Sequence, residues 1–156
     1  MPTPKADLAI EFLPDVLARD GLAWVSAASA SMAPLIQPGD ALCLAPLGVA
    51  RPRLGAIVAY VRDARLVVHR VVAATPGGVV TRGDGLPEAD APLEWTRVVG
   101  RVAAIRTPAG RTLDLGRPPW PLLEGALGRV AGRPARGWLA WKARRLPFHL
   151  AAALFR

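Results

Sequence analysis

The fold of this chain is decided by the stretch Leu66-Val67-Val68-His69-Arg70-Val71-Val72-Ala73-Ala74. Valine dominates it, and the turn-forming sequence Thr75-Pro76-Gly77-Gly78 follows directly. Valine favours extended backbone because its branched Cβ packs well on a pleated surface. The stretch therefore predicts a β-strand over residues 66–74 that ends at a tight turn.

Similar short stretches lie on both sides of this strand, and turns rich in glycine and proline separate them. We expect further strands over residues 22–27, 41–45, 56–61, 78–81, 98–105 and 112–115. Short strands at this spacing are typical of a barrel or a coiled sheet. The sequence thus predicts a mainly β fold, a small coiled β-sheet or barrel.

The two ends of the chain predict helices instead of strands. Apolar residues in 6–19 recur at helical spacing, and Gly21 is placed to end that helix. After a proline-rich linker at 116–121, helices are expected over 122–130 and 138–146, and a separate piece over 148–155 follows Pro147. We therefore divide the chain into an N-terminal helical segment (1–21), a β-rich domain (22–116) and a basic, Trp-rich helical tail (117–156).

The positive charge is concentrated in this tail. The 156 residues carry a formal net charge of +8, yet residues 1–116 hold 12 Lys or Arg against 11 Asp or Glu. Residues 117–156 hold 8 Lys or Arg and the single acid Glu124. Cations mixed with tryptophans on short helices are typical of a segment that contacts anionic lipid. A terminal helix with a solvated basic face, and a tail that binds nucleic acid, remain open alternatives.

The sequence predicts neither a membrane span nor a secretory signal. Every apolar run is broken well before the roughly 20 residues that a bilayer crossing needs, and the first residues lack the basic-then-apolar order of a signal peptide. We therefore expect a cytoplasmic protein, either free or held peripherally on the inner face of the membrane by residues 117–156.

The residues that point to chemistry begin with Ser31. It lies in the small-residue turn Ser29-Ala30-Ser31-Met32-Ala33-Pro34, directly after the predicted strand over 22–27. A serine there is open to an approaching peptide. The hydroxyl of Ser29 and the backbone N–H of Ser31 can donate to one oxyanion.

A serine nucleophile needs a base, and lysine or histidine are the usual ones. The chain has two lysines, Lys5 and Lys142, and neither lies in the β-rich region. Of the two histidines, His149 belongs to the tail, whereas His69 lies within the central predicted strand. His69 is therefore the candidate base, although a core or solvent-facing histidine is the structural alternative.

The order of these motifs resembles that of the type I signal peptidase family. The resemblance covers roughly residues 22–105 and rests on Ser29–Pro34, Pro38-Gly39-Asp40, Leu54–Val58, His69-Arg70-Val71, Thr81–Asp84 and Val98–Val102. It implies that Ser31 is the nucleophile and that Ser29 helps to form the oxyanion hole. The His-Arg-Val context is similar to the endoplasmic-reticulum branch, in which histidine replaces the lysine base.

That branch also has an acidic residue in the Gly-Asp motif and another six positions on, which correspond here to Asp84 and Asp90. A carboxylate beside the imidazole would fix its tautomer and stabilise the imidazolium. We favour Asp84 over Asp90 for this role, because the turn Gly83-Asp84-Gly85 can present its side chain. The chain departs from the family at Gly85, where asparagine is usual, and at Leu35, where threonine is usual.

These observations predict a serine endopeptidase that cleaves a precursor protein or peptide by a Ser–His mechanism with assistance from an aspartate. They call for no cofactor and no metal, and no nucleic-acid partner is expected. The alternative is a related β domain without catalysis that binds a partner or nucleic acid. A purely structural module at a membrane surface would rest on the tail alone.

Overall fold

The computed structural model describes residues 10–156 and contains one antiparallel sheet of eight strands. The strands are β1 (Ala23–Ser26), β2 (Ala41–Ala45), β3 (Ile57–Arg62), β4 (Arg65–Ala74), β5 (Gly78–Arg82), β6 (Leu93–Glu94), β7 (Val98–Arg106) and β8 (Thr112–Asp114). Their spatial order is β1-β2-β7-β3-β4-β5-β6, and β8 pairs with β7 at the side of this path. The seven strands expected from the sequence are present, and the two-residue strand β6 is an addition.

The sheet is open, so the expectation of a barrel is wrong. Closure would require the outer strands to hydrogen-bond to each other, and the last strand, β6, is only two residues long. The sheet curves nevertheless, with register shifts in β2 at Cys43/Leu44, in β3 at Ala59/Tyr60 and in β4 at Val71/Ala73. Such bulges increase the local twist of a strand. The fold class is mixed α/β, because helices form a substantial part of the core.

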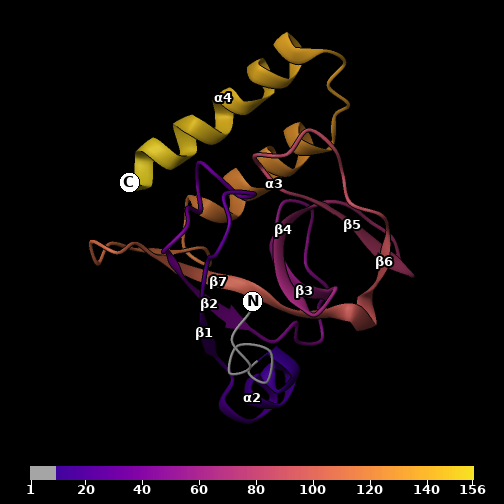
Figure 1. The fold of residues 1–156 in the computed structure, drawn as a ribbon, viewed down its shortest axis with the longest axis vertical. Helices are drawn as coiled ribbons and strands as arrows, with labels where there is room; N and C mark the ends of the chain where they lie inside the picture. The colour runs from indigo at the N-terminus through magenta and orange to yellow at the C-terminus, as the bar shows by residue number, and fades with distance from the viewer. Residues whose placement is uncertain (1–9) are drawn as a thin grey trace.

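Three α-helices pack with the sheet in the described part of the chain (Figure 1). They are α2 (Leu13–Asp20), α3 (Trp120–Gly132) and α4 (Trp138–Phe155), and a short 3-10 helix covers Trp95–Arg97. In Figure 1, α2 and α4 lie at opposite ends of the molecule. No helix in residues 10–156 is long and apolar enough to cross a membrane.

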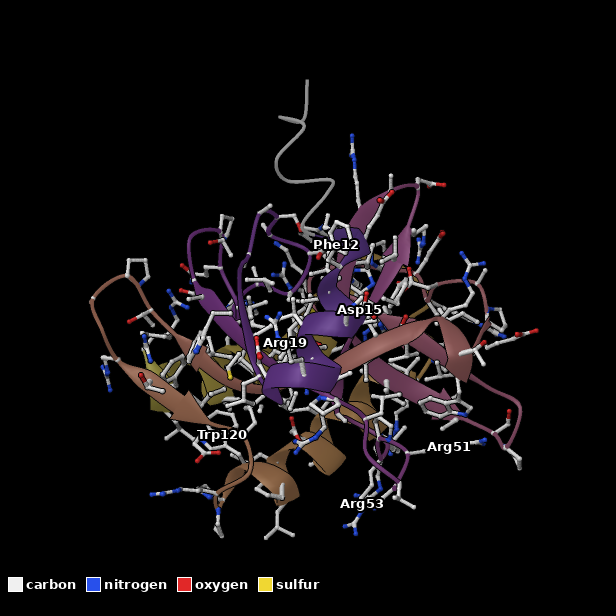
Figure 2. All side chains as sticks on the ribbon, turned by 90° about the horizontal axis from the view of Figure 1, so that it is seen from below. Phe12, Asp15, Arg19, Arg51, Arg53 and Trp120 are labelled. Carbon is white, nitrogen blue, oxygen red and sulfur yellow. The ribbon has the colours of Figure 1, made fainter. Side chains whose placement is uncertain are left out.

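Helix α2 matches the expected amphipathic pattern in part, since Phe12, expected on its apolar face, is 54% exposed. Leu13 and Leu17 are buried, whereas Asp15 and Arg19 are exposed, and Figure 2 views the molecule from this side. Pro14 lies in the first turn, where a missing N–H costs no helical hydrogen bond. Gly21 ends the helix in a left-handed conformation, as expected from the sequence. Residues 6–9 of the expected helix lie outside the described residues.

The C-terminal helices share one core with the sheet. Its members from the tail are Trp120, Leu127, Ala131, Phe148, Ala151 and Phe155, and they pack with Leu42, Leu44, Ile57 and Ile105 of the strands. The expected break at Pro147 is wrong, because α4 runs through this residue. A proline in a helix interior costs roughly 3 kcal/mol, and burial of Phe148, Ala151 and Phe155 just beyond it offsets that cost.

The backbone of helix α3 is in close contact with the backbone of the turn before β3. A Cβ atom added to Gly128 would lie 2.5 Å from the backbone nitrogen of Gly55. One added to Gly55, which has φ +91°, would lie 1.8 Å from the carbonyl oxygen of Glu124. This part of the core therefore depends on glycine at both positions.

Gly128→Ala should lower the free energy of unfolding by about 1–3 kcal/mol, because the added methyl group forces helix and turn apart. The matched control is Gly125→Ala in the same helix, where the nearest atom to the added Cβ is 3.9 Å away. That control should stabilise the helix by up to about 1 kcal/mol. Urea unfolding followed by circular dichroism measures both. Equal effects of the two substitutions would contradict the close contact.

Glu124 makes the free energy of unfolding depend on pH. Burial raises the pKa of Glu124 to about 7, against the opposing attraction of Arg70 and Arg101. The folded protein therefore binds a proton that the unfolded chain releases at lower pH. The resulting stabilisation is complete below the pKa of an unfolded glutamate, about 4.3, and is lost as the pH rises through about 7.

Glu124→Gln should therefore raise the free energy of unfolding relative to wild type more at pH 8 than at pH 5. Urea unfolding at the two pH values measures the difference. Glu88→Gln replaces an exposed glutamate and serves as the control that should show no such change. If the effect of Glu124→Gln were the same at both pH values, the raised pKa of Glu124 would be contradicted.

Candidate active site

Ser31 lies in a loop whose apolar side chains are buried in the core. Its neighbours Met32, Leu35 and Ile36 are almost fully buried in the core. The hydroxyl of Ser29 donates to Ser31 Oγ at 3.1 Å, and the Ser31 amide lies 3.5 Å from Ser29 Oγ. Ser29 is exposed and Ser31 is partly exposed. The predicted nucleophile and its two predicted oxyanion donors are therefore grouped at the surface on a fixed loop.

The Ser31 loop rests on the turn that follows β5. The amide of Gly85 donates to the Ser31 carbonyl oxygen at 2.9 Å. A Cβ atom at Gly83 would lie 2.5 Å from the same oxygen, and one at Gly85 would lie 3.1–3.3 Å from the carbonyl oxygens of residues 30, 31 and 33. Glycine at position 85, unusual for the resembled family, fits this close approach of two backbones.

His69 lies in β4 and is almost fully buried. Its Nδ1 is 2.6 Å from Asp90 Oδ2, and the ring packs edge-on against Tyr60 with centroids 6.3 Å apart. A histidine that donates from Nδ1 to a carboxylate keeps Nε2 available as a proton acceptor. This tautomer is the one that a general base requires.

Asp90 is held by several donors at once. Oδ2 accepts from Thr81 at 2.7 Å and from Tyr60 at 3.1 Å, and Oδ1 pairs with Arg62 at 2.9 Å. Burial acts to raise the pKa of Asp90, but hydrogen bonds from His69, Arg62 and Thr81 outweigh it and hold the pKa well below its usual range. Asp90 is therefore a carboxylate beside the imidazole at neutral pH.

Asp84 has a different partner, so the preference for it over Asp90 is wrong. Its two oxygens accept from Arg70 Nε and Nη2, each at 2.7 Å, and both side chains have no exposed surface. Successive residues of a strand point to opposite faces, so Arg70 lies on the other side of β4 from His69. Arg70 also donates to the Gly55 carbonyl oxygen at 2.8 Å. Asp84 therefore joins a buried structural pair.

The structure adds three residues that the sequence reasoning missed, namely Tyr60, Arg62 and Thr81. Val58 lies opposite His69 in the β3–β4 register, so alternate β3 residues Tyr60 and Arg62 fall on the same face as the histidine. The alternation of residues in β3 shows from the sequence that Tyr60 and Arg62 share one face of the strand. It does not show that this face is the one that bears His69, because the pairing register of β3 with β4 is a long-range property.

A cavity of about 510 Å³ adjoins the Ser31 loop through Gly85. Its lining comes from the turn after β5 and from the start of α4 with the segment before it: Gly85, Pro87, Ala135, Gly137, Trp138 and Trp141. Arg144 of α4 donates to the carbonyl oxygens of Arg133 and Pro87 and so connects the two walls. The cavity is large enough for several atoms of a peptide.

The structure thus brings together Ser29 with Ser31, and His69 with Asp90. Within residues 10–156 no hydrogen bond joins Ser31 to His69: Ser31 Oγ accepts from Ser29, and His69 Nδ1 bonds to Asp90. The same residues contain no cluster of three His, Cys, Asp or Glu side chains that would hold a metal ion. No protein-family model matches this chain, and no curated protein matches it either.

The buried pair makes a stability prediction. Arg70→Met and Asp84→Leu should each lower the free energy of unfolding by about 3–5 kcal/mol, because either one leaves a buried charge without its partner. The double variant should lose much less than the sum of the two. Urea unfolding of all four proteins measures the coupling. Additive losses would contradict a direct, desolvated ion pair.

Proposed function

We propose that this protein is a serine endopeptidase in which Ser31 is the nucleophile, His69 the general base and Asp90 the residue that orients the base. The observation that carries the proposal is the 2.6 Å hydrogen bond between His69 Nδ1 and Asp90 Oδ2. A buried carboxylate with a lowered pKa beside a histidine tautomer suited to accept a proton is the arrangement that serine hydrolysis needs.

In this mechanism Ser31 Oγ attacks the carbonyl carbon of the scissile peptide bond while its proton moves to His69 Nε2. Asp90 stabilises the imidazolium that forms. His69 then gives the proton to the leaving amine as the C–N bond breaks, which leaves an ester on Ser31. A water molecule, deprotonated by His69, then attacks the ester; the ester C–O bond to Ser31 breaks, and His69 returns the proton to Ser31 Oγ.

The negative charge that develops on the carbonyl oxygen needs nearby donors. The Ser31 amide and the Ser29 hydroxyl lie side by side, 3.5 Å apart, on the same loop. In the free protein they interact with each other and with Ser31 Oγ, so substrate binding must redirect both donors. Catalytic hydrogen bonds are often long in a free enzyme and tighten only in the complex with substrate.

Ser31 must also turn from Ser29 to His69 before it can react. The hydroxyl of a serine rotates about a single bond, and Ser31 is partly exposed, so Ser31 Oγ can leave its hydrogen bond with Ser29 by a side-chain rotation. The cavity beside Gly85 offers room for one side of the peptide next to the same loop. The proposed substrate is a precursor protein or peptide, and the resemblance to signal peptidases favours cleavage after small side chains.

The proposal predicts cleavage of a peptide library prepared from a bacterial proteome, with new termini identified by mass spectrometry. Ser31→Ala, His69→Ala and Asp90→Asn should each reduce the initial rate on a selected peptide by about 10⁴-fold or more. Ser29→Ala should reduce it by about 10²–10³-fold, because it removes one oxyanion donor.

The matched control is Ser26→Ala, an exposed serine of β1 that should retain the wild-type rate. Circular dichroism melting confirms that each variant is folded. Cleavage at the wild-type rate by Ser31→Ala or His69→Ala would overturn the proposal. A folded wild-type protein that cleaves no peptide of the library would favour a binding domain without catalysis.

A further inference from the structure

Helix α4 has two apolar faces, and only one of them is covered. The inner face packs into the core through Phe148, Ala151, Ala152 and Phe155, which are 2–5% exposed. The outer face bears what we call the leucine row, which comprises Leu139, Leu146, Leu150 and Leu154. These side chains are 60–75% exposed. Exposed leucines gathered in this way mark an interaction surface.

The leucine row is one continuous stripe. Its members are spaced by seven, four and four residues, so they lie along one side of the helix over about 22 Å. An apolar groove of about 240 Å³ between α3 and α4 extends it; the groove is lined by Leu123, Ala126, Leu127, Val130, Pro147, Leu150, Ala151 and Leu154. Leu122 of α3, 81% exposed, adds a further apolar side chain from this helix.

The exposed charges of residues 120–155 are positive, because the one acidic residue of this stretch, Glu124 of α3, is not exposed. Helix α4 contains no Asp or Glu. Exposed cations are Arg129, Arg133, Arg136 and Lys142. The ammonium of Lys142 lies 3.7 Å from the ring centre of Trp138, and this tryptophan is 62% exposed. An aromatic ring and a cation together are suited to the headgroup region of a bilayer, where one part is apolar and the other is wet.

We propose that the leucine row binds the surface of an anionic membrane, with α4 lying in the plane of the interface. Two features favour lipid over a protein partner. The cations complement acidic headgroups, and the exposed leucines form an apolar stripe that acyl chains can surround. The inner face of α4 stays packed on the core, so the protein binds as a folded body. The proposal is independent of the activity proposed for Ser31.

The test is cosedimentation of the full-length protein with vesicles. Wild type should bind vesicles made of an equal mixture of phosphatidylglycerol and phosphatidylcholine. It should bind vesicles of pure phosphatidylcholine at least about tenfold more weakly. The double variant Leu146→Gln/Leu150→Gln should lose at least about tenfold in partitioning to the anionic vesicles. Lys142→Glu should weaken binding at low salt and have a smaller effect at high salt.

The matched control is Val49→Gln, because Val49 is fully exposed and lies outside the leucine row, in the loop between β2 and β3. This substitution should leave binding unchanged. Thermal melting shows whether the double variant is folded, and Leu139→Gln/Leu154→Gln provides a second pair from the same row. No binding of wild type to anionic vesicles, or equal binding by a folded leucine-row variant, would overturn the proposal. A dimer in the absence of vesicles that the same variants dissociate would assign the surface to a second copy instead.

Discussion

The buried ion pair between Arg70 and Asp84 connects the two parts of the candidate site. Strand β4 points His69 to one face of the sheet and Arg70 to the other. Arg70 holds Asp84, and through it the turn on which the Ser31 loop rests. The proposed base and the loop of the proposed nucleophile are therefore positioned by neighbouring residues of one strand. A charge pair without solvent contact is costly to break, which makes this connection rigid.

The C-terminal helices take part in the same arrangement. The ring of Phe148 in α4 lies 5.6 Å from the guanidinium carbon of Arg70, and α3 packs against Gly55, whose carbonyl oxygen accepts from Arg70. The inner face of α4 thus covers the ion pair while its outer face carries the leucine row. This helix links the core beneath the site to the proposed membrane surface, so residues 117–156 are integral to the fold.

The strands were predictable from the sequence because valine-rich stretches and glycine turns act locally. Strand β6 was missed because two residues form no pattern, and α4 passes Pro147 because tertiary burial outweighs a local penalty. Ser29, Ser31 and His69 could be singled out by residue type and order. The partners of Asp84 and Asp90 could not, since a carboxylate's neighbour depends on strand register and on which face each turn approaches. The same holds for Tyr60 of β3 and Thr81 of β5, whose side chains donate to Asp90.

We propose that Ser31 becomes a nucleophile because His69, oriented by Asp90, accepts its proton. A peptide boronic acid with alanine at its reactive end tests this most directly, because boron becomes tetrahedral when an activated serine adds to it. Boron NMR should show a tetrahedral adduct with the wild-type protein, and folded Ser31→Ala and His69→Ala variants should not form it. A tetrahedral adduct that persists in Ser31→Ala, or its absence from folded wild-type protein, would show that Ser31 is not activated in this way.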